Sequence, residues 1–143
     1  LLARNAERLE EALKLLPGSG HHFATADFQN PEQVQSAVQA LLSQEPIDIL
    51  VNNTGGPEGG PISEAHPDAF LATFQQHLTN NHILTQAVFP GMKKAGWGRV
   101  VNVISTSVKA PLAGLGVSNT VRGAVANWAK TWAQNEIIKI TTF

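Results

Sequence analysis

The chain has 143 residues, a formal net charge of −1 and no cysteine. Its 10 Lys and Arg are balanced by 11 Asp and Glu, so the chain lacks the basic field that attracts nucleic acid or an anionic membrane. The absence of cysteine excludes disulfides, thiolate metal sites and a cysteine nucleophile, and it leads us to expect a cytoplasmic protein. We also expect no metal site, because the 5 His have no ligand spacing.

Apolar residues at helical spacing predict four helices, and apolar or β-branched runs between them predict strands. In chain order we predict a helix over 5–16, a strand over 21–27, a helix over 30–44, a strand over 46–53, a long helix over 66–96, a strand over 98–105, a helix over 117–134 and a strand beginning at Ile137. Asn30 is a suitable cap for the second helix, Pro31 suits its first position, and Gly96 suits the end of the long helix. No segment is typical of a targeting signal or a membrane span.

The alternation of strands and helices predicts an α/β fold with right-handed crossovers and a parallel sheet covered on both faces. In such sheets the ligand crevice lies beyond the carboxyl ends of the strands. The residues that follow the predicted strands are Asp27, Asn52 to Gly56, and Ser105 to Ser107. We therefore expect the functional site among these residues.

Three segments carry a family resemblance: "ILVNNTGG" at 49–56, "LTQAVFPGMKKAGWGRVVNVIS" at 84–105, and a Ser and an Arg at the start of the next helix. Together they resemble the short-chain dehydrogenase/reductase family, from about Leu1 to Phe143. The resemblance implies a Rossmann-like, doubly wound parallel sheet in a single, partial domain over 1–143. We expect truncation at both ends, with the family's first strand–helix unit and last strands missing.

The resemblance implies binding of NADP, or of NAD. The implied cofactor-binding residues are Arg4, Asp27, Phe28, Asn52, Asn53, Thr54, Gly55, Gly56 and Arg122. The family motif after the fourth strand reads NNAG, and Thr54 stands where this pattern has Ala. Glycine lacks a Cβ and lets a ribose approach the backbone, and the guanidinium of Arg4 suits the 2′-phosphate of NADP.

The family's catalytic pattern is an Asn on the long helix, a Ser after the fifth strand, and Tyr-x-x-x-Lys at the next helix start. Ser105 is preserved, since 118 − 105 = 13 is the family's Ser-to-Tyr spacing. The Tyr position holds Ser118, the Lys position holds Arg122, and the Asn position holds His77. The family Tyr is the acid/base, and a serine hydroxyl cannot simply replace a phenol in that role. His77 is the better-tuned candidate, and Lys109 is a further one.

"SNTVR", preceded by "STSVK", resembles a divergent, 3-oxoacyl-carrier-protein-reductase-like subgroup. The resemblance implies an oxidoreductase that transfers a hydride between NAD(P)(H) and a carbonyl or alcohol substrate. Loss of both Tyr and Lys leaves an alternative, a catalytically silent protein that keeps the fold as a binding or oligomer scaffold. A third possibility is an inactive fragment with unpaired sheet edges.

Structural roles also remain open for the candidate site residues. Ser118 suits a helix N-cap, Arg122 suits a partly buried charge paired with an acid, and His77 suits a helix-face or interface position. By resemblance, the helices at 68–94 and 118–134 form an interface between subunits, so we expect a homodimer or homotetramer.

Overall fold

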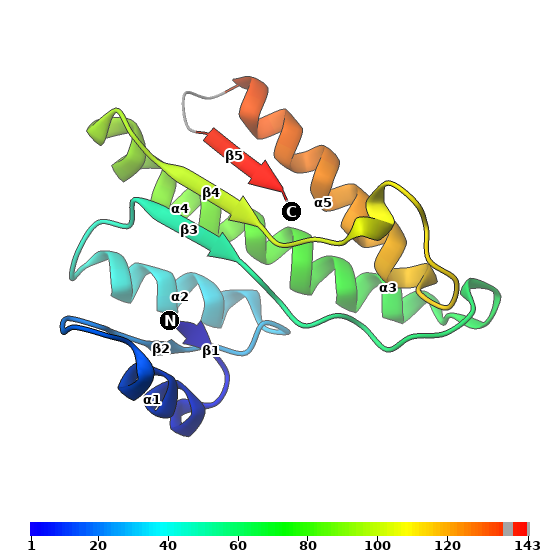
Figure 1. Cartoon of the computed structure of the whole chain (residues 1–143), viewed down its shortest axis with the longest axis horizontal. Coiled ribbons are helices and arrows are strands. Elements are labelled where there is room, and N and C mark those ends of the chain that lie inside the picture. Colours follow the sequence, from blue (N-terminus) through cyan, green and yellow to red (C-terminus); the bar gives the residue numbers. More distant parts are fainter. Residues whose placement is uncertain (136–138, 143) are drawn as a thin grey trace.

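The computed structural model describes residues 1–135 and 139–142, in which strands and helices alternate along the chain (Figure 1). The elements are β1 (Leu2–Ala3), α1 (Ala6–Leu15), β2 (Ala24–Thr25), α2 (Pro31–Leu42), β3 (Ile49–Asn52), α3 (Pro67–Phe74), α4 (Asn80–Ala95), β4 (Arg99–Asn102), α5 (Gly116–Asn135) and β5 (Lys139–Thr142). Short 3₁₀ helices cover Ile62–Glu64 (η1) and Thr106–Val108 (η3), and a π-helical turn covers Gln75–Thr79 (η2). The predicted elements are therefore present, with shorter strands than the sequence indicates.

Capping residues set the ends of α2 and α4 as the sequence predicts. The Asn30 side chain accepts hydrogen bonds from the backbone N–H groups of Glu32 and Gln33 at 3.1 and 3.2 Å, and Pro31 occupies the first turn. Gly96 ends α4 with a left-handed φ of 65°, a conformation that glycine adopts without steric cost. Local chemistry therefore fixes these boundaries.

All the strand pairings are parallel, which confirms the predicted sheet type. β1 pairs with β2, and β3, β4 and β5 form a second sheet in that order. Asn52 at the end of β3 pairs in register with Asn102 of β4, and Asn102 with Thr142 of β5. The strands thus form two sheets within the described residues, whereas we expected one. The predicted start at Ile137 lies outside those residues.

The helices α2, α4 and α5 lie along one side of the strands, and α1 lies apart from them near the N-terminus (Figure 1). The hydrophobic core is on the side of α2 and α4. Its most buried members, all at most 2% exposed, are Ala26, Val34, Val38, Val88, Met92 and Val100. Leu2 of the first sheet and Ile140 of the second pack against this core, so one apolar cluster connects the two sheets.

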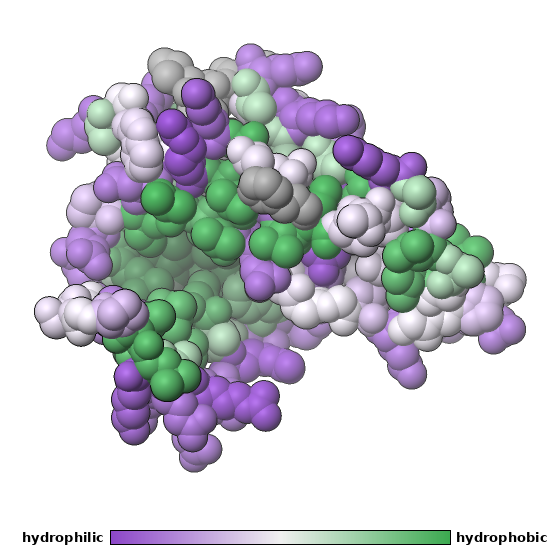
Figure 2. Space-filling model, in the orientation of Figure 1, coloured by the Kyte–Doolittle hydropathy of each residue, from purple (hydrophilic) through white to green (hydrophobic). Residues whose placement is uncertain are grey.

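The other side of β3 is open. Ile49 and Val51 point away from the core and are 56% and 57% exposed. A cavity of about 620 Å³ lies beside them, lined by Leu1 and by Leu2 of β1 on one side, and by β3 and the two residues that follow it on the other. Figure 2 shows it as a broad apolar hollow. Among residues 1–135 and 139–142, β1 and β3 each pair with one strand only, so both have an unpaired edge at this hollow.

The predicted long helix over 66–96 is helical from Pro67 to Ala95, but its middle is π-helical. At the end of η2 the Asn80 N–H donates to the Gln75 carbonyl, one residue farther back than in an α-helix. Such turns occur often at functional sites. Among residues 1–135 and 139–142, none of the helices combines the length and apolar character needed to cross a membrane.

We predict that the open face of β3 makes the 143-residue chain self-associate, because exposed apolar strands with unpaired edges attract further chains. Val51→Lys places a charge in this face and should lower the weight-average mass measured by sedimentation equilibrium. The matched control is Leu71→Lys, which alters a residue of α3 that is 70% exposed and should leave the mass unchanged. An unchanged mass for Val51→Lys contradicts the prediction.

Candidate functional site

Arg122 connects the ends of two neighbouring strands. It lies on α5 and is only 9% exposed. Its Nη1 donates to the Val103 carbonyl at 2.8 Å, and its Nη2 donates to the Thr54 carbonyl at 3.3 Å. Val103 directly follows β4, and Thr54 lies in the loop after β3. The guanidinium therefore binds two backbone carbonyls, and the expected pairing with an acid is absent among the described residues.

His77 lies in the π-helical turn and is 1% exposed. Its Nδ1 forms a hydrogen bond with the Thr54 hydroxyl, and its Nε2 has no partner among the described residues. Burial, with a smaller contribution from the positive charge of Arg122, lowers the pKa of His77 from 6.5 to about 4. Burial also lowers the pKa of Arg122, although arginine stays charged near neutrality. At pH 7 the site therefore contains a neutral imidazole beside a cation.

Three buried asparagines lie behind this loop. Asn102 of β4 accepts through Oδ1 from Asn52 of β3 at 2.9 Å and from Asn81 of α4 at 3.5 Å. Each is at most 5% exposed. The roles of Asn81 and Asn102 escaped the sequence analysis. Asparagine is unfavourable inside helices and strands, so its occurrence in "NNH" and "VVNV" is the signal that could have revealed them.

The two serines differ in their surroundings. Ser105 follows β4, and its Oγ accepts from the Ser107 N–H at 3.1 Å, which leaves its hydrogen available for another acceptor. Ser118 lies half-buried in the first turn of α5. The N-cap role is wrong, because α5 begins at Gly116 and the Asn119 N–H donates to the Leu115 carbonyl at 2.8 Å. Lys109 is exposed just after η3.

The remaining predicted residues follow β1 and β2. Arg4 is exposed immediately after β1. The Asp27 carboxylate accepts from the Gln29 N–H at 2.9 Å, and the Phe28 carbonyl accepts from the Asn80 side chain at 2.6 Å. This last bond ties the loop after β2 to α4.

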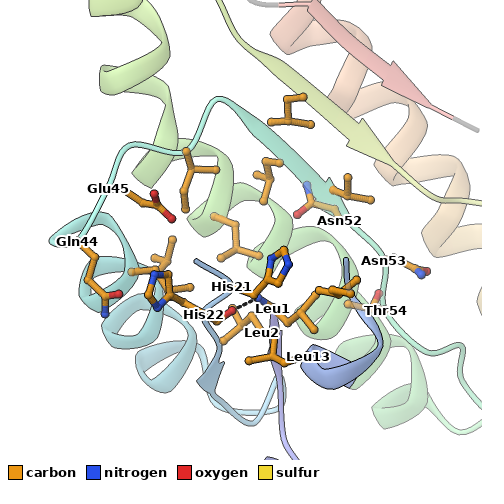
Figure 3. A pocket seen from close by; sticks show the side chains of 18 of the residues that line it. Leu1, Leu2, Leu13, His21, His22, Gln44, Glu45, Asn52, Asn53 and Thr54 are labelled. Carbon is orange, nitrogen blue, oxygen red and sulfur yellow. Dashed lines mark hydrogen bonds between the residues drawn. The ribbon is translucent and has the colours of Figure 1, made fainter. Parts of the chain in front are cut away.

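The loop after β3 borders the cavity. Figure 3 shows Asn52, Asn53 and Thr54 following β3 at the cavity's edge, and Phe28 also lines it. Gly55 and Gly56 are exposed, and a Cβ on either would meet no atom within 4 Å. The predicted residues of the loops thus lie at or just after the carboxyl ends of the strands, and His77, Ser118 and Arg122 lie on helices. Within the described part of the chain, no three His, Asp or Glu side chains gather as a metal site requires.

Comparisons of the sequence with known proteins agree on one family. The family model described as short chain dehydrogenase matches residues 1–141. A candidate ketoacyl reductase of Streptomyces coelicolor is 34% identical over 112 residues, which cover 75% of this chain and 43% of that protein. Gluconate 5-dehydrogenase of Gluconobacter oxydans is 30% identical over 136 residues, which cover 93% of this chain and 53% of that protein.

Solved structures have the same fold. L-sorbose reductase from Gluconobacter frateurii, complexed with NADPH and L-sorbose, superposes with a TM-score of 0.91 at 28% identity, and the match covers 99% of this chain and 57% of that one. A Rossmann-like fold, present in part, is thereby confirmed. The chain spans about half the length of the relatives that it matches.

The low pKa of His77 predicts a pH dependence of stability. The unfolded chain takes up a proton at His77 near pH 6.5, whereas the folded chain does so only near 4. The contribution of neutral His77 to the free energy of unfolding is therefore complete above pH 6.5 and declines as the pH falls toward 4. The difference between the two pKa values corresponds to a loss of roughly 3 kcal/mol in the free energy of unfolding.

Urea unfolding between pH 7.5 and 4 measures this dependence. His77→Gln should remove that part of the decline, and His21→Gln, which alters an exposed histidine, should keep it. An identical decline in the His77→Gln variant would show that His77 is not buried in the neutral form.

Proposed function

Because this chain belongs to the short-chain dehydrogenase family, we propose that the whole protein is an NAD(P)-dependent oxidoreductase acting on a small carbonyl or alcohol substrate. The observation that carries the proposal is the position of Arg4, Asp27, residues 52–56 and Ser105, each at or shortly after the carboxyl end of a parallel strand. Dinucleotides bind at this edge of doubly wound sheets. The related sorbose reductase was crystallised with NADPH, which supports NADP as the cofactor.

The residues at the strand ends fit a dinucleotide in part. The open surroundings of Gly55 and Gly56 allow a ribose or nicotinamide to approach the backbone. Arg4 makes no ion pair among the described residues and could hold a 2′-phosphate. The connections over 4–5 and 26–30 contain no glycine, so neither offers the glycine-rich helix start that binds a pyrophosphate. That contact would come from elsewhere in the whole protein.

The bound cofactor would supply or accept the hydride, and residues of this chain would bind the substrate oxygen. Ser105 is suited to that contact, because its hydroxyl hydrogen is available. At pH 7 His77 is neutral, so it could donate a hydrogen bond but could not act as an imidazolium acid. Ser118, through a water, and Lys109 remain candidates for the proton donor. Because Arg122 donates to two backbone carbonyls, we assign it the role of holding these two loops in place. A contact with the cofactor ribose would use its remaining N–H donors.

The name of the Streptomyces coelicolor relative favours a ketoacyl compound as substrate, in line with the expected 3-oxoacyl thioester.

The second candidate function is a catalytically silent scaffold. It is favoured by the replacement of the family's Tyr and Lys and by the engagement of Arg122 with backbone. A cytoplasmic location, a single domain over 1–143 and the absence of nucleic-acid and membrane partners remain predictions.

We also propose a subunit interface on α4 and α5. Aromatic side chains cluster there: the Phe89 and Trp132 rings lie 5.5 Å apart, and the Trp128 and Trp132 rings lie 6.4 Å apart. Trp128 also donates to His82 at 3.3 Å. Large aromatic residues are enriched at subunit interfaces, which supports the expected homodimer or homotetramer.

Titration of the full-length protein with NADPH, followed by nicotinamide fluorescence, tests cofactor binding. We expect saturable binding that Arg4→Ala weakens about tenfold for NADPH and much less for NADH, because only NADPH has the 2′-phosphate. Arg8→Ala removes a nearby exposed charge from α1 and serves as the control. Absence of any fluorescence change with the unaltered protein contradicts the proposal at its first step.

Oxidation of NADPH in the presence of ketones and 3-oxoacyl thioesters separates the enzyme from the silent scaffold. If the protein is an enzyme, it turns over at least one substrate class, and Ser105→Ala lowers kcat by 10²-fold or more. If only the Ser118→Tyr, Arg122→Lys double variant turns over, the silent scaffold is supported instead. The double variant restores the family's catalytic pair.

A further inference from the structure

Three departures from the family pattern meet at one residue, Thr54, which bonds to the other two. Thr54 stands at the Ala of NNAG, His77 at the helix Asn, and Arg122 at the Lys. The Thr54 hydroxyl bonds to His77 Nδ1, and the Thr54 carbonyl accepts from Arg122 Nη2. Residues that are far apart in the sequence thus share one partner. If the three residues had been replaced independently of one another, they would not be expected to share one partner.

Each change depends on the others. The Thr54 hydroxyl pairs with the imidazole, whereas the alanine of the family pattern offers no partner. The planar guanidinium reaches carbonyls of two loops at once, whereas an ammonium is a compact point charge. Burial, with a smaller contribution from the charge of Arg122, lowers the pKa of His77, so the histidine is tolerated beside this cation in its neutral form.

Thr54 is also where the loop after β3 is attached. Residues 54–59 make no backbone-to-backbone hydrogen bond among the described residues, and Gly55 and Gly56 have no side chain with which to pack. The next tie is at Gly60, whose N–H donates to the Gly114 carbonyl at 2.7 Å. The start of this loop therefore depends on the two contacts of Thr54.

We infer that Thr54, His77 and Arg122 act as one positioning unit that fixes the backbone of residues 54–56 at the site. Helix α5 and the π-helical turn both hold Thr54, one through its carbonyl and the other through its hydroxyl. The value of this rigidity for cofactor binding rests on the proposed function, but the unit itself exists without cofactor. The three replaced residues then function together in the site.

A double-mutant cycle tests the coupling, with urea unfolding of the cofactor-free protein at pH 7.5. Thr54→Val and His77→Asn should each lower the urea midpoint. The midpoint of the double variant should be no lower than that of the less stable single variant. Thr54→Ser, which keeps the hydroxyl, should retain the wild-type midpoint. Thr25→Val alters an exposed threonine of β2, so its effect should add to that of His77→Asn. Additive effects of Thr54→Val and His77→Asn overturn the inference.

NMR supplies readouts that general loss of stability would not change. Arg122→Gln should raise the His77 titration midpoint from about 4 toward the ordinary value, whereas Arg122→Lys keeps the charge and should keep it low. Thr54→Val should change the tautomer populations of His77. Backbone order parameters of residues 54–56 should fall from about 0.85 to below about 0.6 in Thr54→Val and Arg122→Lys. Unchanged order parameters overturn the inference.

These outcomes are separate from those of the proposed function. If the coupling and the loss of order are observed but NADPH does not bind, the positioning unit holds and the proposed function fails. If NADPH binds but the effects are additive and the order parameters do not change, the proposed function holds and the positioning unit is contradicted.

Discussion

The geometry of the site depends on the buried guanidinium of Arg122. From α5 it donates to carbonyls that follow β3 and β4, and it thereby joins the two loops at the carboxyl ends of neighbouring strands. Each carbonyl would lose this hydrogen bond if the guanidinium were removed, and the guanidinium itself is a buried charged group that needs such partners. The loop after β3 has few other ties near Thr54, so its position follows from this contact.

The charge of Arg122 also determines the chemistry nearby. It adds to the effect of burial on His77, so the imidazole is neutral at pH 7. The site therefore combines a fixed cation, a neutral imidazole and the hydroxyl of Ser105, and it lacks the phenol of the family pattern. This combination is well suited to holding backbone and binding an oxygen atom. Proton transfer is the step for which no single residue stands out, and this leaves both an enzyme and a silent scaffold as candidate functions.

The sequence predicted the features that depend on local chemistry or on order along the chain. Asn30, Pro31 and Gly96 identify helix ends through neighbouring backbone groups, and the alternation of apolar runs predicts the parallel pairing. Features that depend on distant partners were missed. The direction of Arg122 is determined by carbonyls 19 and 68 residues away. Likewise, the close approach of Gly116 to η1, where a Cβ would collide with Ile62, depends on a partner that is distant in the sequence.

The anchoring of Arg122 to the two strand ends is tested most directly by scalar couplings across its hydrogen bonds. Couplings from the Arg122 Nη nitrogens to the carbonyl carbons of Thr54 and Val103 can be measured by NMR on the labelled protein. We predict separate Nη signals, each coupled to one of these carbons. A single, averaged Nη signal without either coupling would indicate a freely rotating guanidinium and would contradict this anchoring.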